Sequence, residues 1–249
     1  MNGKQTDDQV FYTNPELVSG NPAIDNIKKL GQDKLFILAS AIYIALPILQ
    51  FFLNTSGTIP IQFIGVVGMI LLVFSCNTKA YPGVKTAGFS VLKGYAITMI
   101  VICGLLALAS VTMIASYDEL MKNEETSEYL NMLYEELTAI TGIEMSIKSV
   151  FGILLAIAAV LALRYAFVIV MCVRLRNTLR TGRNRGKIPV ILAVFFVIMA
   201  FINVIGLFGS AGDANIFSLF LVLLDTAADI SFTLVIFKYN NSLNMLWYS

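Results

Sequence analysis

Two carboxylates and one guanidinium lie inside long apolar segments of this sequence, where charged side chains are rare. Asp225 and Asp229 are one helical turn apart in one apolar segment, and Arg164 lies within another. An unpaired charge at the centre of a bilayer costs about 2.5–3.5 kcal/mol even on lenient insertion scales. Such residues are therefore expected to form an ion pair, to carry a proton or cation, or to bind a charged ligand.

Six apolar stretches must position these residues. We compared the length of each stretch with the roughly 20 residues that a helix needs to cross a bilayer. The sequence predicts transmembrane helices over 35–53, 61–76, 94–116, 149–173, 188–209 and 215–237. The second stretch is short and needs residues 58–60 or a thin bilayer to reach across. Only 13% of the residues are charged, against about 25% in soluble domains. We expect an all-α integral membrane protein with a six-helix bundle.

The lysines and arginines predict how this bundle is oriented, because positive residues accumulate on the cytoplasmic side. Fourteen of the seventeen fall on the side that carries both termini, and the external loop 117–148 holds only Lys122 and Lys148. We therefore expect a multi-pass protein of the cell membrane, with a cytoplasmic tail at residues 1–34, a membrane domain at 35–237 and a second cytoplasmic tail at 238–249. The polar first 34 residues predict no cleavable signal peptide.

Depth along the helices predicts which charges meet. Arg164 lies 15 residues past Ser149, about 22 Å along the axis, and Asp229 lies 14 residues past Asn215, about 21 Å. Both segments run in the same direction, so we expect an Arg164–Asp229 ion pair between adjacent helices. Asp225 could accept from the same guanidinium or stay protonated. Either the pair is structural, or the site relays a proton or cation or anchors a charged ligand.

Further polar groups accompany these charges. Asn203 lies in the fifth predicted helix, and Ser218, Asp225, Asp229 and Thr233 share one face of the sixth. We therefore expect a polar intramembrane site between the fourth and sixth predicted helices, with Asn203 as an additional member.

Two amphipathic segments flank the membrane helices. Residues 22–31 predict a short helix that lies on the membrane face, or else a solvated helix that leads into the first span. In the external loop, one helical face collects apolar side chains: Tyr129, Leu130, Leu133, Leu137 and Ile140. We expect a helix across the outer mouth of the bundle; its acids could attract cations or a basic peptide, or form an ordinary solvated face.

The most basic stretch is the cytoplasmic loop 174–187. It is expected to contact anionic lipid headgroups, each base contributing about 1 kcal/mol near the surface, or an acidic cytoplasmic partner. Its glycines do not form a P-loop, since that motif needs GxxxxGK[ST] between a strand and a helix. The candidate contact residues are Arg174, Arg176, Arg180, Arg183, Arg185 and Lys187.

Several function classes are disfavoured. The chain has no histidine, and its three cysteines are far apart, so we expect no metal site, cofactor or catalytic centre. The net charge of +1 gives no case for nucleic acid. The sequence favours a small transporter, a permease or a transport-associated subunit. The alternative is a membrane scaffold or an immunity-type accessory protein, with a protein partner or a second copy of the chain.

Overall fold

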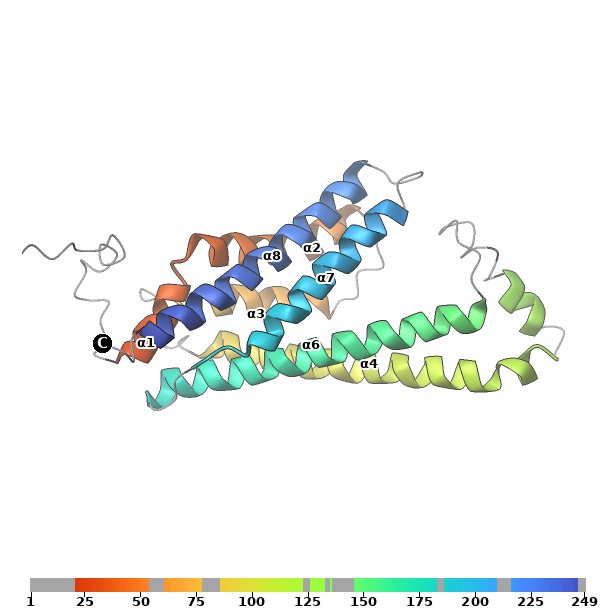
Figure 1. Cartoon of the computed structure of the whole chain (residues 1–249), viewed down its shortest axis with the longest axis horizontal. Coiled ribbons are helices and arrows are strands. Elements are labelled where there is room, and N and C mark those ends of the chain that lie inside the picture. The colour runs from red at the N-terminus through yellow and green to blue at the C-terminus, as the bar shows by residue number, and fades with distance from the viewer. Residues whose placement is uncertain are drawn as a thin grey trace, which may run out of the picture.

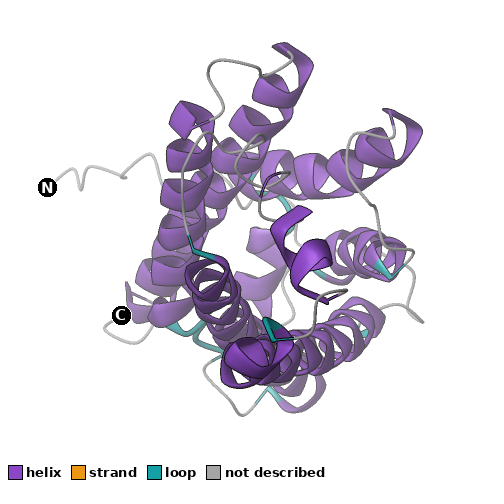
Figure 2. Ribbon diagram, turned by 90° about the vertical axis from the view of Figure 1, so that its right-hand side faces the viewer, coloured by secondary structure: helices purple, strands orange, loops and turns teal. Residues whose placement is uncertain are grey.

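The computed structural model describes residues 21–53, 61–77, 86–122, 126–132, 135, 146–182, 186–209 and 216–245. All regular elements in these ranges are helices, as Figure 2 shows. Besides the helical residues 126–132, they are α1 Pro22–Leu30, α2 Lys34–Leu53, α3 Gln62–Ser75, α4 Ala87–Leu120, α6 Ile147–Thr181, α7 Val190–Gly209 and α8 Ile216–Met245.

Four of these helices, α2, α4, α6 and α8, are long and apolar enough to cross a membrane, and α3 and the described part of α7 are apolar but shorter. The helices extend further than their apolar cores. With 34 and 35 residues, α4 and α6 are about 51 and 53 Å long, and α8 continues eight residues beyond the predicted end at Phe237. Hydropathy marks where the apolar segment ends, whereas polar residues such as Arg180 still favour a helix.

The helices α2, α3, α4, α6, α7 and α8 form a ring in which each contacts two neighbours. The strength of these contacts divides the ring into two groups of three helices. The first half contains α3, α4 and α6, and the second contains α2, α7 and α8. Contacts are extensive within each half, moderate between α2 and α3, and sparse between α6 and α7. In Figure 1, α7 starts beside the C-terminal part of α6 and then diverges from it. We call the end that carries α1 the α1 end, and the end at which α4 ends and α6 begins, joined by the Lys148–Asp118 ion pair, the hairpin end.

The N-terminal helix α1 closes the α1 end. Asn21 caps it by accepting from the amides of Ala23 and Ile24, and Pro22 occupies its first turn. The predicted helix is present, and the protein core covers Ala23, Ile27 and Leu30 of its apolar face. The helix α1 contacts α6 and α8, and Ile27 and Leu30 are buried in the same core as residues of those two helices. This burial removes both side chains from water and from lipid.

Close backbone packing joins α3 to α4. A Cβ added at Gly88 would lie 2.3 Å from the backbone nitrogen of Leu72, so only glycine permits this approach. The Gly88 amide also donates to the Ser75 hydroxyl at 3.2 Å. These contacts explain why α3 belongs to the α4–α6 half.

Part of the predicted external helix is described. Residues 126–132 are helical, with Leu130 buried and Tyr129 71% exposed. Of the two described residues on the predicted apolar face, Leu130 is therefore covered by the protein and Tyr129 is not. Leu133, Leu137 and Ile140 lie outside the described residues.

Candidate functional site

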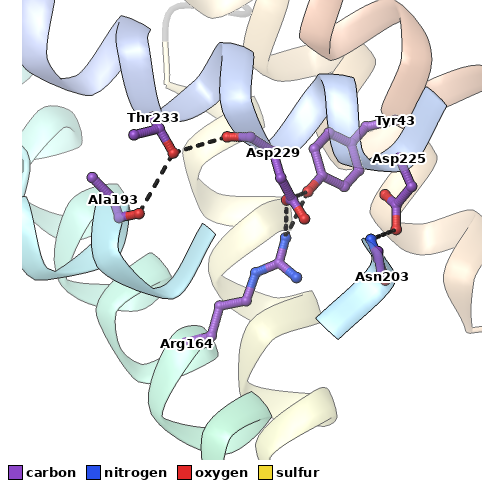
Figure 3. A network of polar contacts seen from close by, with 7 residues as sticks. All are labelled: Tyr43, Arg164, Ala193, Asn203, Asp225, Asp229 and Thr233. Carbon is purple, nitrogen blue, oxygen red and sulfur yellow. Dashed lines mark hydrogen bonds and ion pairs between the residues drawn. The ribbon is translucent and has the colours of Figure 1, made fainter. Parts of the chain in front are cut away.

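Arg164 and Asp229 meet in the middle of the bundle, together with a tyrosine from a third helix (Figure 3). Arg164 Nη2 lies 3.3 Å from Asp229 Oδ1 and donates to the Tyr43 hydroxyl at 2.6 Å. The Tyr43 hydroxyl in turn donates to Asp229 Oδ1. Asp229 is 1% exposed and Arg164 14%, so the carboxylate is enclosed and the guanidinium is largely covered. We call these residues the central cluster.

The rings around the central cluster come from α2, α7 and α8. The Arg164 guanidinium lies 4.7 Å from the centroid of the Phe196 ring, a favourable cation–π distance. Phe196 stacks on Phe232 at 5.5 Å, and Phe232 also contacts the rings of Tyr43 and Phe36. Phe36 and Phe232 lie nearer the α1 end than Tyr43 and Asp229, so aromatic packing covers the central cluster on that side.

Backbone groups complete the surroundings of Asp229. The Thr233 hydroxyl donates to the Asp229 carbonyl at 2.9 Å and approaches the Ala193 carbonyl of α7 at 3.5 Å. The first of these is the back-bond that helical threonines commonly make. Thr233 therefore lies on the predicted polar face, but it bonds to the backbone rather than to the carboxylate.

Asp225 lies one turn nearer the hairpin end and has a different partner. Its Oδ2 accepts from the Asn203 side-chain amide of α7 at 3.0 Å. Both side chains are partly exposed, whereas Asp229 is buried. The structure therefore separates the two aspartates into one that is enclosed beside a guanidinium and one that is accessible beside a neutral amide.

The predicted contact between Arg164 and Asp229 is present, but its setting differs from the prediction. We expected adjacent helices, yet α6 packs mainly on α4, and α8 on α2 and α7. Arg164 therefore reaches from one half of the molecule to the other. Asp225 does not share this guanidinium in the structure, and Ser218 lies in α8 with its side chain outside the described residues.

Tyr43 was missed because it was treated as one more residue of an apolar segment. A depth comparison could have found it. Counted from the predicted cytoplasmic ends of their helices, Tyr43, Arg164 and Asp229 lie about 12–14 Å deep. A tyrosine hydroxyl at that depth needs a hydrogen-bond partner, and the two charged residues were the available ones.

The basic residues gather at the α1 end, away from the central cluster. Arg174, Arg180 and Lys187 are exposed and Arg176 is partly buried, while Arg183 and Arg185 lie outside the described residues. The guanidinium of Arg174 donates to the Lys187 carbonyl at 3.4 Å. Among the described residues of the stretch 174–187, three positive side chains are thus exposed.

Hydrogen bonds fix the chain on both sides of the basic loop. The Asn21 amide donates to the Gly182 carbonyl at 3.0 Å, and the Tyr239 hydroxyl donates to the Gly186 carbonyl at 3.1 Å. The Asn240 side chain pairs with both the amide and the carbonyl of Ile188, at 3.0 and 2.8 Å. Side chains from α1 and α8 therefore hold the connection between α6 and α7.

Chemically, the described site can hold charge and exchange hydrogen bonds. Among the residues that the structure describes, no three His, Cys, Asp or Glu side chains gather to hold a metal ion. The central cluster and Asp225 contain two carboxylates and one guanidinium, so their summed charge is one negative unit when all three are ionised. No protein-family model, no curated protein and no solved structure matches the chain.

Proposed function

We propose that the chain is a small membrane transporter, or the membrane subunit of a transport system, and that Asp225 carries the coupled proton or cation. The observation that supports this proposal is the unequal setting of the two aspartates. Asp229 is buried with Arg164 and Tyr43, while Asp225 is partly exposed and bonded to a neutral amide. Ionisable groups inside a membrane commonly mark ion pathways.

The charges of Arg164, Asp229 and Asp225 indicate which ion Asp225 could bind. Arg164 can neutralise one carboxylate, and it contacts Asp229. Asp225 then has two ways to avoid a bare charge in a low-dielectric environment: it takes up a proton, or it binds a cation from solution. Both processes move positive charge into the bundle, and both need the access that a partly exposed side chain has.

We further propose that the chain crosses the cell membrane six times, with the α1 end in the cytoplasm. The distribution of lysine and arginine supports this orientation. The short α3, with 14 residues, would cross about 21 Å and would need a locally thin bilayer. Arg174, Arg180 and Lys187 would then contact anionic headgroups of the inner leaflet.

Ion flux into proteoliposomes tests this function. Purified protein is reconstituted into vesicles that contain a pH-sensitive dye, and a potassium diffusion potential drives proton entry; a second series uses a sodium gradient and a sodium dye. We expect faster flux of one ion than in protein-free vesicles, and at least a tenfold reduction in Asp225→Asn, because the amide cannot take up a proton or neutralise a cation.

A matched variant shows whether the effect belongs to the site. Asp118 also lies in an apolar helix, but at its exposed hairpin end, where it pairs with Lys148. Asp118→Asn should therefore retain the wild-type flux. Flux at the vesicle background for both ions, or equal flux in wild type and Asp225→Asn, contradicts the transport proposal.

One observation favours a second function, that of a non-transporting scaffold or accessory subunit. The central cluster satisfies its own charges, since Arg164, Tyr43 and Asp229 bond to one another. Buried polar groups arranged in this way can specify which helices pack together without any transport role. A wild-type protein that gives no flux but co-purifies with a membrane partner would support this function.

A further inference from the structure

We infer that the α3–α4–α6 half and the α2–α7–α8 half move relative to each other as two bodies, and that the central cluster holds them together at mid-length. The halves would pivot along the α1 end and the α2–α3 contact, and separate where α6 faces α7, toward the hairpin end. This inference goes beyond the transport proposal and does not depend on it, because a scaffold could use the same motion.

The α1 end provides the pivot. Helix α1 contacts both α6 and α8, and its Asn26 side chain donates to the Tyr239 carbonyl of α8 at 3.3 Å. On its other side, Asn21 holds Gly182 at the end of α6. The same small helix is therefore bonded to both halves, which keeps their ends together while the remainder can change angle.

At mid-length, contacts between α6 and the other half end at the central cluster. The Phe167 and Phe195 rings stack with their centroids 5.7 Å apart, and Arg164 follows with its contacts to Phe196, Tyr43 and Asp229. Between described residues, no hydrogen bond, ion pair or ring contact joins residues 147–163 of α6 to α2, α7 or α8. Arg164 is thus the last such link of α6 toward the hairpin end, whereas α2 and α3 stay in contact on that side through the Phe51 and Phe63 rings, whose centroids are 5.4 Å apart.

Toward the hairpin end the helices are poorly covered by one another. Of the most apolar part of α6, 6% of the residues are buried, against 39% in α8. Leu108 of α4 and Phe201 of α7 are each 67% exposed. Figure 1 shows α7 and α8 rising away from the α4–α6 pair in this region. A bilayer can cover these side chains at any separation of α6 from α7, so these exposed side chains do not fix the angle between the halves.

The central cluster can act as a two-state contact because its members are costly to separate. Pulling Arg164 away would leave a buried carboxylate and a buried hydroxyl without this partner, and unpaired buried groups are strongly unfavourable. The closed arrangement is therefore favoured until another group replaces the guanidinium. Weakening the cluster should release the halves without unfolding either one.

Electron–electron distance measurements on the full-length protein in lipid nanodiscs test this inference. Cys76, Cys103 and Cys172 are first replaced by alanine, and spin labels are placed at Leu108→Cys and Phe201→Cys, one in each half. A reference pair at Leu108→Cys and Ile153→Cys lies within one half. We expect Arg164→Gln to shift the first distance to values several ångströms longer and to leave the reference distance unchanged.

A milder variant keeps the test decisive if Arg164→Gln fails to fold. Tyr43→Phe retains the ring and removes only the hydroxyl that joins Arg164 to Asp229, so it should shift the same distance in the same direction by a smaller amount. Tyr117→Phe, on α4 outside the central cluster, is the matched control and should change neither distance. An unchanged distance between the halves in both cluster variants overturns the inference, as does an equal change in the reference pair. No flux is measured, so the transport proposal is tested separately.

Discussion

Asp229 combines nearly complete burial with a charge, and its neighbours make that combination tolerable. Removing one member of a buried ion pair usually costs about 3–5 kcal/mol, because the other charge stays buried, whereas replacing both by apolar residues is often neutral or stabilising. We therefore expect Arg164→Leu and Asp229→Leu each to lower the thermal unfolding temperature in detergent strongly. The double variant should recover most of the loss.

The unfolding temperatures of the two single variants and the double variant distinguish a packing role of the ion pair from a role in binding or transport. Recovery in the double variant would indicate that the pair chiefly fixes packing. If Asp229→Leu alone raises the unfolding temperature, the carboxylate is retained at a cost to stability, and a role in binding or transport is favoured. Leu108→Ala, on the exposed face of α4, controls for general effects of changing a large side chain.

Asp33 links protonation to stability at the α1 end. Burial alone would raise its pKa, but hydrogen bonds from Lys238 and from the Leu35 and Phe36 amides, with attraction by the Lys238 charge, lower the pKa below its usual 3.8. A lowered folded-state pKa gives stability that is present above the unfolded-state pKa and is lost as the pH falls through the folded value.

The predicted change therefore lies at acidic pH. Between pH 5 and 2.5 the wild-type unfolding temperature should fall more steeply than that of Asp33→Asn, which cannot lose this charge. Asparagine can still cap the start of α2, so the two proteins differ mainly in the ion pair. Identical slopes for both proteins would show that Asp33 contributes nothing to acid sensitivity.

At the scale of elements, the contact between α3 and α4 depends on one glycine. Gly88→Ala would place a methyl group 2.3 Å from the backbone of Leu72. The two helices must then move apart, and overpacking of this kind costs about 1–3 kcal/mol. Gly104→Ala on the same helix meets no atom within 4 Å and should keep or raise stability, because alanine favours a helix by about 1 kcal/mol over glycine. Equal unfolding temperatures for the two variants would contradict this packing.

Hydropathy predicted where the long helices run, but it could not predict where they end or which faces they share. The apolar segments 35–53 and 61–76 nearly coincide with α2 and α3, because proline, glycine or polar residues lie directly at the ends of both segments. The extensions of α4, α6 and α8 were missed, since a helix continues into water without any change in backbone geometry. The helix α1 was predicted either to lie on the membrane face or to lead as a solvated helix into the first span, and its contacts with α6 and α8 were not predicted, because periodicity does not identify what covers a face.

At the scale of the whole molecule, the proposed orientation predicts which ends are accessible from outside the cell. A membrane-impermeant thiol reagent applied to intact cells should label Asp118→Cys, at the hairpin end. It should label Asn241→Cys, near the end of α8, only after the cells are broken. Both side chains are exposed, so a difference in labelling reports the side of the membrane. Labelling of Asn241→Cys in intact cells would reverse the proposed topology.

Matching depth predicted the Arg164–Asp229 contact, but not the packing order that creates it. Depth is a one-dimensional coordinate and places two residues at the same level without saying which helices lie between them. The closed order of six helices, with its sparse α6–α7 contact, depends on the shapes of many side chains at once. Tyr43 joins the central cluster through that order, and a search limited to charged residues could not include it.

The three residues of the central cluster lie far apart in the sequence, and this has a consequence for biosynthesis. Tyr43 is made first and Arg164 much later, and Asp229 follows Arg164 by another 65 residues. At roughly 5–20 residues per second, the ribosome needs about 3–13 s to supply the carboxylate. In the proposed six-span arrangement, α6 enters the membrane before α8, and Arg164 would then lie there without its acid and extend its long side chain toward the headgroups. Insertion of α8 would be the step that allows α6 to settle at its final depth.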